Sequence, residues 1–333
     1  MVITQDNLKT LIQSLIKNNQ TVIGPVNEGN TSNYKSITSF DEINLALSYP
    51  TKSTKEYFFT DSEPILTYAF SEKNKPTIEE PSEPKSLILF GVRPCEAISY
   101  PIMDNVFSWG YRDEFYLKRR EKNIIISVAC ENCDEFCFCT SVGISPQTTE
   151  GSDIFLQKTE KGNYLIQFIT DKGKNLLASY KTLIESSDEK PIDYKGPEKK
   201  FDISVIKPWL EKNFEHPIWN KIVLPCIGCG ACTYLCPTCH CFDIIDEGTL
   251  KGGCRYKNWD ACQFAMFTIH ASGHNPRDTQ SKRFRQRIQH KFNYYADKFG
   301  KTLCVGCGRC IRHCPADMSL LNVLTTIDRL VKK

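Results

Sequence analysis

Two short cysteine runs have a spacing suited to chemistry at a metal centre. Each run holds four cysteines spaced C-x2-C-x2-C-x3-C and is followed by a proline. The runs are Cys226, Cys229, Cys232 and Cys236, then Cys304, Cys307, Cys310 and Cys314. Bacterial ferredoxins bind [4Fe–4S] clusters with this spacing. Structural zinc prefers two C-x2-C pairs separated by a longer loop, so the compact runs favour iron–sulfur clusters.

The fourth cysteine of each run is expected to serve the other run. In ferredoxins with two clusters, this cysteine ligates the cluster held by the opposite run. We therefore predict a first cluster on Cys226, Cys229, Cys232 and Cys314. We predict a second cluster on Cys304, Cys307, Cys310 and Cys236. Glycines between the cysteines would let the backbone loop tightly around each cluster.

Five further cysteines lie in the first 200 residues. Cys95 follows one expected strand and Cys130 the next, and loops at strand ends are where α/β domains build sites. We predict a third cluster on Cys95, Cys130, Cys137 and Cys139, with Cys133 left as a spare thiol. Ordinary buried thiols and a zinc site are the alternatives.

Four more cysteines follow the first run closely. They are Cys239, Cys241, Cys254 and Cys262. With His240 they would suffice for a further cluster, or they would line the pocket as apolar packing. His240 and His313 neighbour cluster cysteines, and we expect them to support those ligands rather than to bind iron.

The surrounding elements indicate an α/β domain over residues 1–200. Apolar residues at helical spacing predict a helix over 6–17 with Asp6 as its cap. Buried-strand patterns occupy 87–90, 123–129 and 153–169, and the proline-rich stretch 74–85 is typical of a loop. The polar stretch 187–200 suggests a domain boundary.

Residues 201–333 have a different pattern. Helical periodicity covers 205–215 and 318–331, and a long helical segment over 258–299 is broken near Gly273. Strand signals are scarce. We therefore predict a mostly α-helical dicluster ferredoxin domain over residues 201–333.

Composition excludes several classes of function. The 42 basic residues nearly balance 39 acidic ones, which argues against nucleic-acid binding despite the basic stretch 282–291. That stretch would form a docking or solvated face, or would neutralise nearby clusters. The sequence shows no signal peptide and no apolar stretch long enough to span a membrane. We expect a cytoplasmic protein, where thiols stay reduced.

Several stretches resemble a known family. They are FGVRPCEA, YLKRR, CFCTSVG, CPTCHCFDIIDE, NWDACQF, ASGHNPR, RFRQRIQHKFNYY and CVGCGRCIRHCP. They resemble the iron–sulfur β subunit of sulfhydrogenase-type cytosolic [NiFe]-hydrogenases and the related iron–sulfur subunits of anaerobic sulfite reductases. The 67 residues between Cys236 and Cys304 also resemble the helical insert of dicluster domains in fumarate reductase and heterodisulfide reductase subunits.

This resemblance implies an electron-transfer subunit without catalytic residues of its own. Its partners would be a flavoprotein that reacts with NAD(P)H and a catalytic subunit of hydrogenase, sulfite reductase or heterodisulfide reductase type. The chain itself lacks a G-x-G-x-x-G motif after an expected strand. One alternative is a catalytic subunit that reduces a sulfur compound at the N-terminal cysteine site. Another is a structural or regulatory iron–sulfur module.

Overall fold

The computed structural model describes residues 1–29, 31–46, 49–70 and 75–332. Its strands are β1 (Val2–Ile3), β2 (Thr21–Glu28), β3 (Thr31–Ser36), β4 (Ser62–Phe70), β5 (Pro76–Glu79), β6 (Leu87–Val92), β7 (Ile124–Val128), β8 (Ile154–Lys158), β9 (Tyr164–Phe168), β10 (Phe242–Thr249) and β11 (Gly252–Trp259). Its α-helices are α1 (Gln5–Lys17), α2 (Pro94–Ala97), α3 (Ser99–Phe107), α4 (Glu114–Lys122), α5 (Asp171–Leu177), α6 (Ile203–Lys212), α7 (Ile218–Ile222), α8 (Ala231–Tyr234), α9 (Gln280–Gln289), α10 (Tyr295–Phe299), α11 (Arg309–Arg312) and α12 (Leu320–Val331). A π-helical turn, η6 (His290–Tyr294), joins α9 to α10.

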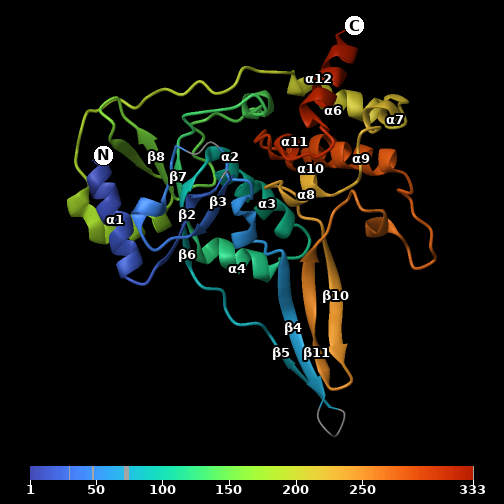
Figure 1. The fold of residues 1–333 in the computed structure, drawn as a ribbon, viewed down its shortest axis with the longest axis horizontal. Coiled ribbons are helices and arrows are strands. Elements are labelled where there is room, and N and C mark those ends of the chain that lie inside the picture. Colours follow the sequence, from blue (N-terminus) through green and yellow to red (C-terminus); the bar gives the residue numbers. More distant parts are fainter. Residues whose placement is uncertain (30, 47–48, 71–74, 333) are drawn as a thin grey trace.

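A seven-stranded mixed sheet forms the N-terminal body (Figure 1). Its strand order is β1-β9-β8-β7-β6-β2-β3. The central strands β2, β6, β7 and β8 run parallel, while β1, β3 and β9 pair antiparallel at the two sides. The strands predicted over 87–90, 123–129 and 153–169 are confirmed. Parallel strands need crossover connections, which here carry α2, α3 and α4 between β6 and β7.

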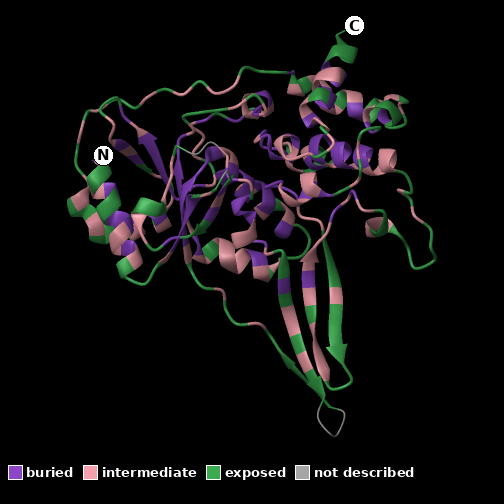
Figure 2. Cartoon of the chain, viewed as in Figure 1, coloured by how far each residue is buried: buried purple, intermediate pink, exposed green. Residues whose placement is uncertain are grey.

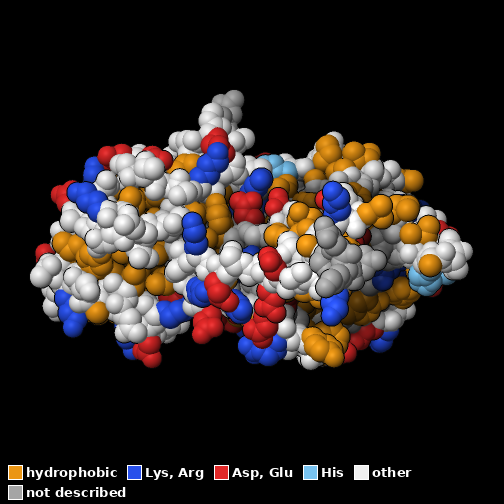
Figure 3. Space-filling view, turned by 90° about the horizontal axis from the view of Figure 1, so that it is seen from below, with side chains coloured by type: hydrophobic (Ala, Val, Ile, Leu, Met, Phe, Trp, Pro, Cys, Tyr) orange, Lys and Arg blue, Asp and Glu red, His pale blue; other side chains and the backbone are white. Residues whose placement is uncertain are grey.

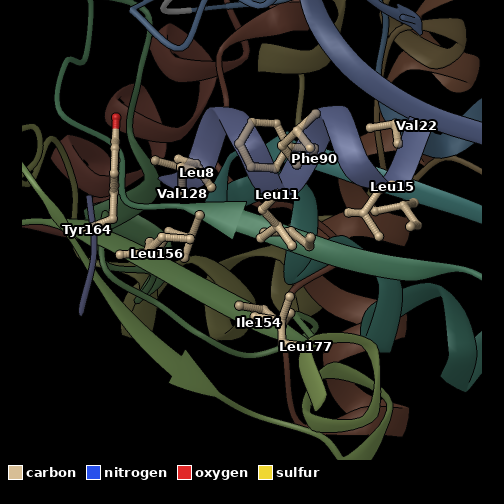
Figure 4. Close-up of a cluster of buried hydrophobic side chains, with 14 of the residues drawn as sticks. Leu8, Leu11, Leu15, Val22, Phe90, Val128, Ile154, Leu156, Tyr164 and Leu177 are labelled. Carbon is tan, nitrogen blue, oxygen red and sulfur yellow. The ribbon is translucent and has the colours of Figure 1, made fainter. Parts of the chain in front are cut away.

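Helices cover both faces of this sheet. Ile88 and Phe90 of β6 pack with α1 in one core, whereas Leu89 between them packs with α3 and α4 in another. This alternation is the period of a strand buried on both faces. Figure 4 shows α1 lying over the first of these cores. The predicted α1 is confirmed, but its cap is Thr4, whose hydroxyl accepts from the Asn7 N–H, rather than Asp6.

A four-stranded antiparallel sheet projects from the body as an arm (Figure 1). Its strand order is β10-β11-β4-β5, so residues 62–70, 76–79 and 242–259 build it together. The arm is mostly exposed or half-buried, in contrast to the buried central sheet (Figure 2). Seen from its tip, the molecule presents both apolar and charged side chains (Figure 3).

The arm corrects two sequence predictions. Residues 76–79 of the expected loop 74–85 form β5, while position 74 lies outside the described residues. The hairpin β10–β11 lies inside the part predicted to be mostly helical, and that prediction is not confirmed. Nearly every residue of β10 is exposed, so the strand has no buried face to give an alternating pattern.

Helices α6, α7, α9 and α12 enclose the C-terminal core. Ile206, Leu210, Ile288, Leu324 and Ile327 are buried there, and the predicted helices over 205–215 and 318–331 correspond to α6 and α12. The long helix expected over 258–299 is wrong for its first half. Residues 260–279 contain only the short 3-10 turn Ala265–Thr268, and the helix begins after the Thr279 cap. No helix in the described part of the chain is long and apolar enough to span a membrane.

Candidate metal centres

The first cavity collects cysteines from both runs. Its wall includes Cys226, Cys229 and Cys232 of the first run, and Cys314 of the second. These are the residues predicted to share the first cluster. Cys310, which is predicted for the second cluster, also lines this cavity.

The residues predicted for the second cluster also lie together. Cys236 and Cys304 are buried, and the two thiols lie close enough to influence ionisation. Burial raises the pKa of Cys304 to about 11, and the nearby Cys236 thiolate contributes to this shift. Burial likewise raises the pKa of Cys307 and of Cys310, with Cys236 again a neighbour of both. The four thiols therefore form one electrostatic group.

All five cysteines of the N-terminal part line a separate cavity, which we call the third cavity after the cluster predicted there. Four of them are the residues predicted for that cluster, namely Cys95, Cys130, Cys137 and Cys139. Cys133, predicted as a spare, lies on the same wall and is exposed. The strand ends explain this convergence, because Cys95 follows β6 and Cys130 follows the neighbouring parallel strand β7.

The third cavity adjoins the second group of cysteines. Cys307 and Gly306 line it together with the N-terminal cysteines. The Phe138 N–H donates to the Gly306 carbonyl at 2.9 Å, so the segment between Cys137 and Cys139 lies directly on the second run. Since Cys310 lines the first cavity, the second group contributes a cysteine to the wall of each of the other two cavities.

Glycines shape the loops of both runs. Gly228, Gly230, Gly306 and Gly308 have φ between +65° and +76°. This left-handed conformation costs little for glycine and turns the backbone tightly around each cavity. At Gly306 a Cβ atom would lie 2.5 Å from the Cys139 backbone nitrogen, so the close approach itself requires glycine.

Among the described residues, three buried cations without a carboxylate partner contact Cys236 or its neighbour Cys239. Lys55, Arg287 and Lys291 are at most 4% exposed. The Lys291 Nζ lies 3.2 Å from Cys236 Sγ, and Arg287 donates to Cys239 Sγ at 3.3 Å. Lys55 donates to the Cys239 carbonyl at 3.1 Å, and burial lowers the pKa of Lys55 to about 8. Within the described ranges, none of the three forms a salt bridge with an acidic residue.

These cations test whether an anionic cluster fits. Burying a cation without a compensating anion is strongly unfavourable. Thiolate ligands of an iron–sulfur centre would supply the missing negative charge at this position. The donor set and the electrostatics of the site therefore both fit [4Fe–4S] groups.

A single metal ion fits less well. Four thiolates about 2.3 Å from one zinc ion would have to converge tightly. Among the described residues, no three His, Cys, Asp or Glu side chains are grouped closely enough to hold a single ion. A [4Fe–4S] cubane has iron and sulfide at alternating corners, and each iron takes its own ligand, so the ligand sulfurs would lie farther apart. The spread of the cysteines around each cavity agrees with that requirement.

The remaining cysteines divide into two situations. Cys241 and Cys262 interact with each other, and the Thr233 hydroxyl lies 3.9 Å from Cys262 Sγ. Cys239 is buried beside Cys236. Cys254, in contrast, lies on β11 between Thr67 and Glu247 of the neighbouring strands. Cys254 therefore lies on the arm, apart from Cys239, Cys241 and Cys262. Only those three thiols remain for the further cluster that the sequence suggested.

The basic stretch 282–291 faces inward in part. Arg285, Arg287 and Lys291 are buried, whereas Lys282 is only partly buried and pairs with Asp278. Three roles were considered for this stretch. The positions of Arg287 and Lys291 beside cysteine sulfurs agree best with neutralising negative charge there. Sequence reasoning missed Lys55, which lies far from either run and has no motif to mark it.

An ion pair buried in the seam between the sites was also missed. Glu96 follows Cys95, Arg309 precedes Cys310, and their side chains form a salt bridge with exposures of 0% and 4%. The other oxygen of Glu96 accepts from the Ser53 and Thr54 hydroxyls at 2.7 and 2.8 Å. No sequence pattern relates Glu96 to Arg309, because 213 positions separate them.

Two comparisons with known proteins give a match. Residues 225–318 match the model of a family described as a 4Fe-4S dicluster domain. The chain is 31% identical over 316 residues to Sulfhydrogenase 2 subunit beta of Pyrococcus furiosus, covering 92% of each chain. No solved structure gives a significant match.

Proposed function

The chain belongs to the family of sulfhydrogenase beta subunits, and from this premise we propose that it passes electrons between two partners. One would be a flavoprotein that reacts with NAD(P)H. The other would be a catalytic subunit of hydrogenase, sulfite reductase or heterodisulfide reductase type. That the chain is an iron–sulfur electron-transfer subunit follows from its family and from its dicluster domain.

We assign three sets of ligands to three [4Fe–4S] groups. The first set is Cys226, Cys229, Cys232 and Cys314. The second set is Cys304, Cys307, Cys310 and Cys236. The third set is Cys95, Cys130, Cys137 and Cys139. The shared cavity walls and the uncompensated buried cations support this assignment.

The observation that carries the proposal is the continuity of the three sites. Cys310 of the second set lines the first cavity, and Cys307 of the same set lines the third. When bound, a [4Fe–4S] group accepts and donates one electron at a time. The chain's residues would hold such groups in an unbroken series, and of the middle set Cys236 and Cys304 are buried while Cys307 and Cys310 are partly buried.

The two ends of this series are open to solvent. Cys229 at the first cavity and Cys133 at the third are exposed, whereas Cys236 and Cys304 between them are buried. Exposure at both ends supports two docking partners, each approaching a different terminal site. A buried middle and accessible ends are what an electron relay between two proteins requires.

The proposed division near residue 200 has structural support. Residues between the 3-10 turn Ala178–Leu183 and α6 form no helix or strand, and this segment runs along the molecule to the C-terminal helices (Figure 1). We propose an α/β part over residues 1–200 and a cluster-binding part over 201–333. We further propose that the protein works in the cytoplasm, where its thiols stay reduced.

Substitution in the purified complex tests the relay. In Cys304→Ser, electrons from NAD(P)H should still reach a dye at the flavoprotein, but turnover at the catalytic subunit should fall at least about a hundredfold. Cys254→Ser, on the arm, is the matched control and should retain both activities. The proposal is wrong if Cys304→Ser leaves overall turnover unchanged, or if the isolated chain reduces a sulfur compound without partners.

A further inference from the structure

Lys291 lies among backbone and sulfur acceptors at the centre of the molecule. Its Nζ donates to Cys236 Sγ at 3.2 Å, to the Thr238 hydroxyl at 3.2 Å and to the Leu303 carbonyl at 2.9 Å. Leu303 directly precedes Cys304, so the ammonium contacts both segments that supply the second set of ligands. The side chain is 2% exposed, which keeps water from screening its charge.

The Lys291 ammonium has sulfur and oxygen acceptors but no carboxylate partner among the described residues. Because a buried cation without an anion is unfavourable, its position beside Cys236 Sγ favours an anionic centre there. Lys291 also lies on the π-helical turn η6, a geometry that is rare and often found at functional sites.

The first set of ligands has different hydrogen-bond donors. Cys226 Sγ accepts from the neutral amide of Gln280 at 3.3 Å, and Cys314 Sγ accepts from the Met318 backbone N–H at 3.2 Å. Arg287 reaches only the carbonyl oxygen of Cys232, at 2.8 Å, while its other nitrogen donates to Cys239 Sγ. Among the donors described at the assigned ligand sulfurs, Lys291 is thus the charged one.

We propose that Lys291 is a positioning residue that raises the reduction potential of the centre held by Cys236, Cys304, Cys307 and Cys310. Reduction adds negative charge, and a fixed ammonium beside a ligand sulfur stabilises that charge more than a neutral donor does. The inference rests on the proposed function, because it requires a centre at this set. With Lys291 in place, the centre at the middle site should hold an added electron more strongly than the same centre would without Lys291.

The test is a redox titration followed by electron paramagnetic resonance on the purified complex. Lys291→Gln keeps a donor but removes the charge, and Lys291→Arg keeps the charge. Arg285→Gln is the matched control, because Arg285 is buried on the adjoining helix α9 but pairs with Glu215 instead of sulfur. Lys291→Gln should weaken one-electron reduction of one centre at least tenfold, which corresponds to about 59 mV. Lys291→Arg should recover most of that loss, and Arg285→Gln should leave every potential unchanged.

The outcomes separate this inference from the proposed function. Unchanged potentials in Lys291→Gln, with normal iron content, would overturn the role of Lys291 alone. Absence of any reducible iron–sulfur signal in the unmodified protein would overturn the proposed function. If Lys291→Gln loses iron, the inference is tested instead on the unmodified protein labelled with 15N-lysine. Pulsed resonance should then detect a lysine nitrogen coupled to one reduced centre, and no such coupling would overturn the inference.

Discussion

Glu96 and Arg309 form a salt bridge that is buried on both sides and joins the N-terminal cysteine site to the second cysteine run. Glu96 adjoins Cys95, and Arg309 lies between Cys307 and Cys310. Arg309 also donates to the Pro50 carbonyl at 2.9 Å. The pair therefore fixes the third site against the second, a contact on which a continuous series of centres depends.

Removing the charge of Glu96 should destabilise this seam. In Glu96→Gln the guanidinium of Arg309 would remain buried without its anion, which typically costs about 3–5 kcal/mol. Urea denaturation of the purified chain measures the change in the free energy of unfolding. Glu114→Gln is the control, because Glu114 pairs with Arg112 on the surface, where such a pair contributes about 0–1 kcal/mol. Equal effects of the two substitutions would contradict the role of the buried pair.

A methyl group at Gly306 should damage the contact between the second and third sites. The Cβ of Gly306→Ala would lie 2.5 Å from the Cys139 backbone nitrogen, and backbone cannot move aside as a flexible side chain can. We expect a loss of stability well above the about 1–2 kcal/mol of the left-handed conformation alone. We also expect less bound iron.

Gly300→Ala provides the control for backbone strain. Gly300 has a similar φ of +72°, but a Cβ there would meet no atom within 4 Å. The Gly300→Ala protein should lose about 1–2 kcal/mol of unfolding free energy and keep its full iron content. Urea denaturation and iron analysis of both variants check the prediction, which fails if Gly306→Ala behaves like Gly300→Ala.

Lys257 should anchor the arm to the body. Its Nζ lies 3.0 Å from Glu63 Oε2 and 2.9 Å from Asp113 Oδ2, and the lysine side chain is only 4% exposed. Lys257→Met would remove the described cation partner of Asp113 and leave Glu63 with Arg119 alone. We expect it to lower the free energy of unfolding by about 3 kcal/mol. Hydrogen exchange should then accelerate along β4 and β11.

Arg255 provides the matched control, because it lies on β11 like Lys257 but forms an exposed ion pair with Asp246 of β10. Both side chains are about half exposed, so Arg255→Met should change exchange rates little. Protection of β4 and β11 that survives Lys257→Met would show that the arm is held by its strand pairing alone.

Local patterns predicted the elements whose side chains are buried, either as a short apolar run in a strand or at helical spacing in a helix. The strands β6, β7, β8 and β9 and the helices α1 and α12 follow this rule. The hairpin β10–β11 was not predicted because β10 is mostly exposed and β11 is mostly half-buried. In addition, β11 pairs with β4, a strand about 190 positions away in the sequence. A periodic sequence pattern arises where one face of an element is buried, and the arm has few buried residues to produce such a pattern.

Part of each candidate site could also be predicted from the sequence. Spacing alone grouped each cysteine run, since ligands close in sequence must lie close in space. Contacts between distant segments were not accessible, and they include Glu96 with Arg309, Lys291 with Cys236, and Cys307 with the third cavity. These contacts depend on how the two parts of the chain pack.

Iron content measured alongside substitution at the third site tests the central claim most directly. With three [4Fe–4S] groups, the purified protein should contain about twelve iron atoms per chain. Cys95→Ser combined with Cys139→Ser should lower this to about eight, whereas Cys254→Ser should leave it unchanged. About eight iron atoms in the unmodified protein, unaffected by the double substitution, would contradict the continuous series of three centres.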